Sequence, residues 1–172
     1  MAPVEVAFLF IIVIFVLVGA VRGFSREIGV TVMLLIALLI LQLIDHQAAG
    51  ARDKVLGFIA GPDPGAQLTA RAIIYALFVI VVAFISYQGE TLTFPTAGAS
   101  GTMGLLAGLL NGYLFAGSIW YYQAQANWPL MPVCCNYDNL YLALSKLLPP
   151  EILDWRYLIA LVVIMMIVRV WK

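Results

Sequence analysis

The chain contains five long apolar stretches that carry almost no charge. They lie near residues 6–22, 28–45, 71–88, 101–122 and 155–171. A helix needs about 20 residues to cross the ~30 Å hydrocarbon core of a bilayer, and flanking arginine and aromatic side chains extend a slightly shorter run to the interface. These stretches predict an all-α integral membrane protein: one domain, residues 1–172, folded as a bundle of four to five transmembrane helices.

The composition favours lipid over water as the solvent of this chain. Only 10% of the 172 residues are charged, whereas a soluble domain carries about 25%. Lysine and arginine together number nine, as do aspartate and glutamate. No basic patch therefore points to nucleic acid, and the expected partner is the lipid bilayer.

The first apolar run is expected to be retained as a helix rather than cleaved as a signal peptide. Glu5 is the only charge before it, whereas Arg22 and Arg26 follow it, and signal peptides have the opposite order. Arginines in a short loop favour the cytoplasm, so the N-terminus is expected outside and residues 22–27 inside. Arg22, Arg26 and Glu27 are expected to anchor this turn at the membrane boundary, with a lipid-phosphate contact through the arginines as the alternative.

The polar connections predict one tight hairpin and two short interfacial helices. Residues 22–27 are so short a link that the first two spans are expected to form an antiparallel hairpin. Residues 47–60 mix charged and apolar side chains and stop at Gly61-Pro62, and residues 138–148 begin with a capping aspartate. Both segments are too short and too polar to cross the bilayer, so they are expected to lie along its surface.

Small residues recur at every fourth position of the fourth run. They are Ser100, Gly104, Gly108, Gly112 and Ala116. This spacing places them on one helix face, where another helix backbone can approach closely. The stripe predicts a helix-packing face, either inside this chain or as a seam for a second copy or a partner subunit. The same glycines leave open a re-entrant hairpin in place of a full span.

Few other residues suggest chemistry. Asn111 lies beside the stripe, and a buried amide in lipid is expected to hydrogen-bond to another helix. His46 follows the second run at the membrane boundary, where an interfacial role is favoured over binding a tetrapyrrole. Cys134 and Cys135 are adjacent, which does not suit an ordinary disulfide. No catalytic motif is found in the sequence, which predicts a non-enzymatic protein with no metal or cofactor.

A short motif lies between the first two apolar runs. Its residues are Arg22, Gly23, Phe24, Arg26 and Glu27, with Ser25 at the variable position. This motif between two apolar helices resembles the CvpA family, the colicin V production proteins, and the glycines of the fourth run give a second similarity. The chain departs from the family at Gly101-Thr102-Met103, where a charged pair is usual, at Asn111, where an arginine would stand, and in its fifth run. The resemblance implies a multi-pass protein of the bacterial inner membrane, linked to export and envelope maintenance.

The sequence leaves three functional hypotheses. The leading one is a non-enzymatic CvpA-like inner-membrane protein that acts through helix packing with itself or with partner subunits. The first alternative is an accessory subunit of a large respiratory or photosynthetic membrane complex. The second is a small channel or transporter, which the lack of mid-membrane charge in the runs disfavours.

Overall fold

The computed structural model describes residues 4–89, 101–130 and 139–170. Every regular element in these ranges is a helix. Ser100, Asp138, Cys134 and Cys135 lie outside the described residues, so the expectations for them are not addressed by the structure.

Four helices are long and apolar enough to cross a membrane. They are α1 (Val4–Arg22), α2 (Phe24–Gln47), α4 (Pro64–Gln88) and α5 (Gly101–Gln125). The chain therefore has the architecture of a multi-pass, all-α membrane protein, as its apolar runs predict. Four shorter helices complete it: α3 (Ala49–Ala60), α6 (Asn139–Ser145), α7 (Pro149–Ile152) and α8 (Trp155–Val170).

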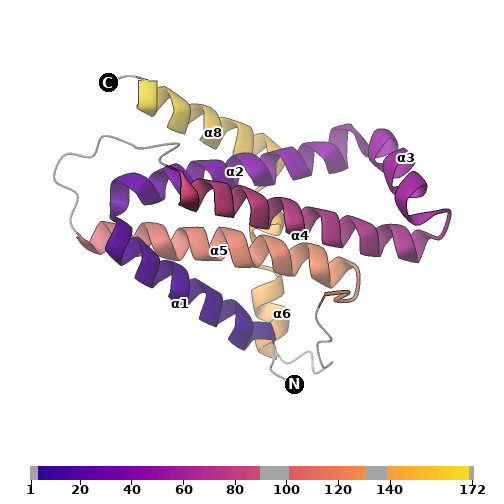
Figure 1. Cartoon of the computed structure of the whole chain (residues 1–172), viewed down its shortest axis with the longest axis horizontal. Coiled ribbons are helices and arrows are strands. Elements are labelled where there is room, and N and C mark those ends of the chain that lie inside the picture. Colours follow the sequence, from indigo (N-terminus) through magenta and orange to yellow (C-terminus); the bar gives the residue numbers. More distant parts are fainter. Residues whose placement is uncertain (1–3, 90–100, 131–138, 171–172) are drawn as a thin grey trace.

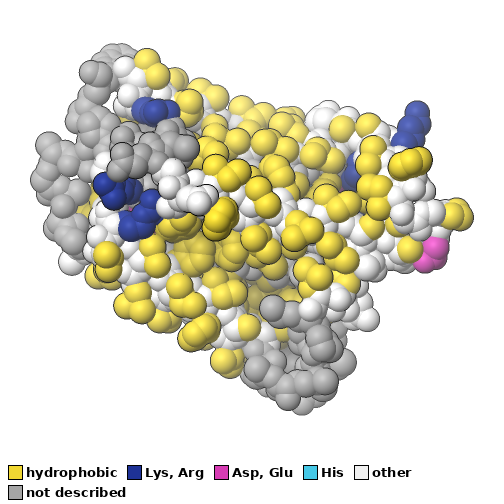
Figure 2. All heavy atoms as spheres, viewed as in Figure 1, with side chains coloured by type: hydrophobic (Ala, Val, Ile, Leu, Met, Phe, Trp, Pro, Cys, Tyr) yellow, Lys and Arg dark blue, Asp and Glu magenta, His cyan; other side chains and the backbone are white. Residues whose placement is uncertain are grey.

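Helix α5 lies at the centre of the bundle. Figure 1 shows α1 along one side of α5, α2 and α4 along the other, and α8 against the outer side of α2. Helices α2 and α5 run in the same direction, and α1 and α4 run in the opposite one. Apolar side chains cover the middle of the face seen in Figure 2, and lysine and arginine gather towards its two ends. This distribution matches a hydrocarbon layer bounded by two polar interfaces.

The main core lies between α2 and the three helices that pack around it, α4, α5 and α8. Helix α2 contributes buried side chains at helical spacing, from Val30 through Leu34 and Leu38 to Leu41. Its partners are Tyr75, Val79 and Ala83 of α4, Leu114 and Tyr122 of α5, and Leu158 of α8. A smaller core lies at the start of α1, where Val4 and Phe8 meet Ala116, Trp120 and Leu148. The two cores hold α1 and α2 on different sides of α5.

The link between α1 and α2 is shorter than the sequence predicts. Gly23 alone separates the two helices, and the predicted polar turn over residues 22–27 is wrong because Ser25, Arg26 and Glu27 form the first turn of α2. Gly23 has φ 82°, a conformation open to glycine without strain. The two helices run in opposite directions but touch mainly near this corner, because α5 packs beside both of them.

The other spans also differ at their ends. Helix α4 begins at Pro64 rather than near residue 71, because Asp63 caps it by accepting a hydrogen bond from the Ala66 amide at 2.8 Å. Helix α5 is unbroken from Gly101 to Gln125, so the re-entrant alternative is wrong. Helix α8 has 16 residues and is not among the four long helices, and its crossing of the bilayer stays a prediction.

The two predicted interfacial helices are present with shorter bounds. Helix α3 covers 49–60 of the predicted 47–60, and α6 covers 139–145 of the predicted 138–148. Gly61 ends α3 with φ 76°, as the sequence predicts. In Figure 1, α6 stands across the direction of α5 and α3 turns away from the axis of α2. Their placement in the bilayer plane stays a prediction.

Candidate functional site

The glycine stripe of α5 packs against α1. A Cβ added at Gly104 would lie 2.5 Å from the carbonyl oxygen of Gly19, and one added at Gly112 would lie 2.9 Å from the Cα of Ile12. A Cβ at Gly108 would overlap the carbonyl oxygen of Phe15 and lie 3.1 Å from the Cα of Gly19. The nearest atoms are backbone, so no side chain could rotate away. Glycine is required here by close helix contact inside one chain.

Two further small residues of α5 allow close packing, one in the core shared with α1 and the other against α7. Ala116 continues the stripe and is buried with Phe8 and Trp120. Gly117, which the sequence analysis did not single out, lets α7 approach: a Cβ there would lie 2.5 Å from Cδ of Pro149. The close contacts of α5 with α1 and with α7 therefore fix both the position of α5 beside α1 and the rotation of α5 about its own axis.

The rotation of α5 turns Asn111 towards α2. Its side-chain amide donates to the backbone carbonyl oxygen of Glu27 at 3.0 Å and to the Oε2 atom of Glu27 at 2.8 Å. The hydroxyl of Thr31 lies 2.7 Å from Oδ1 of Asn111 and donates to it. Asn111, Glu27 and Thr31 are all buried, at 0–1% exposure. The predicted hydrogen bond from Asn111 to another helix is confirmed, and it reaches a carboxylate.

Glu27 joins four helices at this point. Besides Asn111 of α5, the hydroxyl of Tyr87 in α4 donates to Oε2 at 2.9 Å. The Nη1 atom of Arg22, at the end of α1, lies 3.5 Å from Oε1, and its guanidinium is 4.6 Å from the centroid of the Tyr87 ring. We call these five residues, Arg22, Glu27, Thr31, Tyr87 and Asn111, the Glu27 network. The side chain of Glu27 is buried among the helices at this end of the bundle, and the anchoring of the turn at the membrane boundary stays a prediction.

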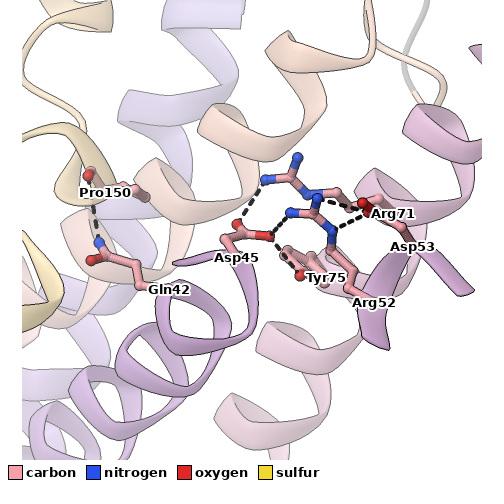
Figure 3. Close-up of polar contacts among 7 residues, drawn as sticks. All are labelled: Gln42, Asp45, Arg52, Asp53, Arg71, Tyr75 and Pro150. Atoms are coloured by element: carbon pink, nitrogen blue, oxygen red, sulfur yellow. Dashed lines mark hydrogen bonds and ion pairs between the residues drawn. The ribbon is translucent and has the colours of Figure 1, made fainter. Parts of the chain in front are cut away.

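A second polar cluster lies at the other end of α2 (Figure 3). Asp45 accepts hydrogen bonds from Arg52 of α3 at 2.9 Å, from Arg71 of α4 at 2.7 Å and from the hydroxyl of Tyr75 at 2.9 Å. Arg52 also pairs with Asp53, its neighbour in α3. Asp45 is only 15% exposed. This Asp45 cluster fastens α3 and the start of α4 to the end of α2.

A nearby amide attaches the C-terminal helices to the same end of α2. The side-chain nitrogen of Gln42 donates to the carbonyl oxygen of Leu153 at 2.6 Å and lies 3.4 Å from that of Pro150. Leu153 precedes α8, and Pro150 belongs to α7. At a rise of 1.5 Å per residue, Glu27 and Asp45 are about 27 Å apart along α2, close to the ~30 Å thickness of the hydrocarbon core. The two clusters thus lie at opposite ends of α2, separated by a length that matches the hydrocarbon core of a bilayer.

We expect Asp45→Asn to lower the free energy of unfolding by about 1–2 kcal/mol, because both arginines lose the negative charge that they share. Thermal unfolding in detergent would measure this. Asp53→Asn is the matched control, since Asp53 is 58% exposed and pairs with the same Arg52; its effect should be close to zero. Equal effects of the two substitutions would contradict a specific role of Asp45.

Metal and cofactor ligands do not gather in the described part of the chain. No group of three histidine, cysteine, aspartate or glutamate residues there could hold a metal ion. His46 is exposed near the end of α2, and its interfacial role stays a prediction. The arrangement instead offers a fully buried carboxylate, Glu27, that is hydrogen-bonded by side chains from two other helices of the bundle.

Comparison with known proteins adds no relative. No family model, no curated protein and no solved structure matches this chain.

The sequence contains one indication of the Glu27 network, which is the position of Glu27 on an apolar helical face. The neighbouring polar residues Ser25 and Arg26 made this position look like part of a loop. Glu27 lies on the same helical face as Thr31, Leu34 and Leu38, which line the core of the bundle. A carboxylate on an apolar stripe needs buried partners, and Asn111 supplies one of them from the far helix. Asp45 continues the same helical face four residues after Leu41, but that spacing does not indicate that its partners come from α3 and α4.

Proposed function

We propose that this chain is a non-enzymatic, CvpA-like protein of the bacterial inner membrane that acts by packing its helices against a second copy or against partner subunits. The motif shared with that family supports the proposal through its physical roles at one corner of the bundle. Gly23 makes the turn, and Arg22 pairs with Glu27. These roles explain why such a motif would join two spanning helices.

The observation that carries the proposal is the uneven covering of the helices. Helix α2 is covered by α4, α5 and α8, whereas α1 and α8 each contact the bundle along one side. The outer face of α1 exposes Phe10 and Leu17, at 65% and 61%, and α8 exposes Ile164 and Val168, at 59% and 61%. Lipid or another membrane helix covers such faces in a membrane protein.

The state of assembly tests this proposal. We expect native mass spectrometry after gentle extraction to find the chain in a defined complex, either with itself or with other membrane proteins. Cross-linking in intact membranes is the parallel measurement, because it does not depend on the detergent. A chain that remains monomeric in both measurements would contradict packing with a partner.

An accessory subunit of a large energy-converting complex is the first alternative. The helix that favours it is α8, which adds an apolar surface outside the four long helices and has only one fully covered side chain, Leu158. Native mass spectrometry distinguishes this alternative by mass, because the chain would then be extracted with many different subunits rather than with copies of itself.

A channel or transporter is the second alternative. The Glu27 network supports it to a degree that the sequence did not suggest, because an ionisable group inside a membrane-spanning bundle is often part of an ion or proton path. Purified protein in liposomes would test it through proton or ion flux. Flux that is absent from empty liposomes and from a Glu27→Gln protein would favour a channel or transporter over packing alone.

A further inference from the structure

The two carboxylate oxygens of Glu27 have unequal surroundings. Oε2 accepts two hydrogen bonds, from Tyr87 and from Asn111. Oε1 is buried and accepts none. The nearest cation, Nη1 of Arg22, is 3.5 Å away and is itself buried without a hydrogen-bond partner. Oε2 is therefore fixed by two hydrogen bonds, whereas Oε1 has none.

This asymmetry suits a group that can carry a proton. A strong hydrogen bond between a guanidinium and a carboxylate spans about 2.7–2.9 Å, so the contact between Arg22 and Glu27 is a loose ion pair. A proton on Oε1 would disturb no hydrogen bond of the network, because Oε2 would remain the acceptor for Tyr87 and Asn111. Only the attraction of Arg22 would be lost.

The guanidinium group of Arg22 has an alternative position when it is not paired with Glu27. It is the last residue of α1, its side chain is 20% exposed, and its guanidinium already lies over the ring of Tyr87. An arginine at a helix end can extend towards the lipid headgroups while its stem stays on the apolar surface. Both members of the pair are thus accommodated whether or not Glu27 is ionised.

We propose that Glu27 is a proton-binding site inside the membrane-spanning bundle, where a proton on Oε1 replaces Arg22 as the partner of the carboxylate. An O–H bond forms between Oε1 and a proton from water, and no other covalent bond changes. The ion pair, which is neutral as a whole, becomes a neutral acid and a free guanidinium cation. Arg22 then pairs with water or with a lipid phosphate at the interface.

Among the described residues, the charged and polar groups that face or flank the site come from each element packed there. Arg22 faces Glu27 from α1, the phenol of Tyr87 faces it from α4, and α5 contributes the neutral amide of Asn111. Arg26 lies in the first turn of α2 itself. The end of α8 that carries Arg169 lies at the same end of the bundle (Figure 1). Arg22 forms an ion pair with Glu27.

Infrared difference spectroscopy on the protein in lipid nanodiscs tests the proposal directly. We expect a carboxylic acid C=O band to appear as the pH is lowered and to be missing from the Glu27→Gln protein. Asp45→Asn and Glu5→Gln are the matched controls, because each removes another shielded carboxylate of the described residues and should leave that band in place. Glutamine has the shape of the neutral acid, so Glu27→Gln is expected to fold. A Glu27→Gln protein that does not fold, or a band that it keeps, would overturn the proposal.

An apolar carbodiimide gives an independent chemical test, because it modifies protonated carboxyl groups inside membranes. We expect labelling of Glu27, located by mass spectrometry, to rise as the pH falls. Arg22→Gln should raise labelling about 10-fold or more at alkaline pH, since a nearby arginine favours the ionised carboxylate. Arg26→Gln is the matched control and should leave labelling near the wild-type level. Equal labelling of the wild-type and Arg22→Gln proteins at every pH would show that Arg22 and the proton do not compete.

Discussion

Gly108→Leu is expected to destabilise the isolated monomer by about 3 kcal/mol or more, the upper end of the cost of overpacking a core. The reason is geometric. Even the first side-chain atom would overlap the carbonyl oxygen of Phe15 and lie 3.1 Å from the Cα of Gly19. Both are backbone atoms of α1, so the only relief is to move α1 away from α5.

Thermal unfolding of the monomer in detergent measures this loss. Gly50→Leu is the matched control, because Gly50 also lies in a helix but has nothing within 4 Å of an added Cβ. That substitution removes a glycine from a helix without a clash and is expected to raise stability by up to about 1 kcal/mol. A Gly108→Leu monomer as stable as the wild type would show that α1 and α5 do not pack through the glycine stripe.

The effect of Gly108→Leu on assembly distinguishes packing of the glycine stripe within one chain from docking of another chain on it. The stripe is occupied by α1 of the same chain, so Gly108→Leu should weaken the monomer before it weakens any complex. If the monomer kept its stability and only the complex were lost, the stripe would be a docking face for another chain, and the α1–α5 contact described above would be wrong.

The sequence predicted the spanning helices because their signal is local. A run of about 20 apolar residues has few stable alternatives to a membrane helix, whatever the rest of the chain does. The ends were less accurate, because polar residues can belong to a helix when a cap or a partner is available. Asp63 extends α4 to Pro64, and Glu27 extends α2 to Phe24 through its buried hydrogen bonds.

The candidate site was only partly predictable for a related reason. The spacing of Gly104, Gly108 and Gly112 defines a packing face but not the helix that fills it, so the sequence left a partner subunit as an alternative. Asn111 was expected to bond across helices, yet nothing in its neighbourhood indicates that the acceptor is Glu27. Such pairings depend on how the helices pack, which the periodicity of one helix does not encode.

Asn111→Leu is expected to lower the free energy of unfolding by about 2–4 kcal/mol, because it removes a donor from a buried carboxylate. Leucine has nearly the shape of asparagine, so packing changes little. Without the amide, Oε2 of Glu27 keeps only the hydroxyl of Tyr87, and the backbone carbonyl oxygen of Glu27 loses one donor. The cost comes chiefly from the poorly solvated charge rather than from one interhelical hydrogen bond, which in membrane proteins contributes about 0.6 kcal/mol.

Thr31→Val provides the matched control for this prediction. Thr31 is equally buried and also bonds to Asn111, but its hydroxyl donates no hydrogen bond to the carboxylate oxygens of Glu27. Its loss should cost below about 1 kcal/mol. Unfolding of both proteins in the same detergent compares them. If Thr31→Val were as costly as Asn111→Leu, the number of hydrogen bonds would matter more than the buried charge. If neither changed stability, the network would not hold α2 against α5, and the seam with α1 would have to fix α5 by itself.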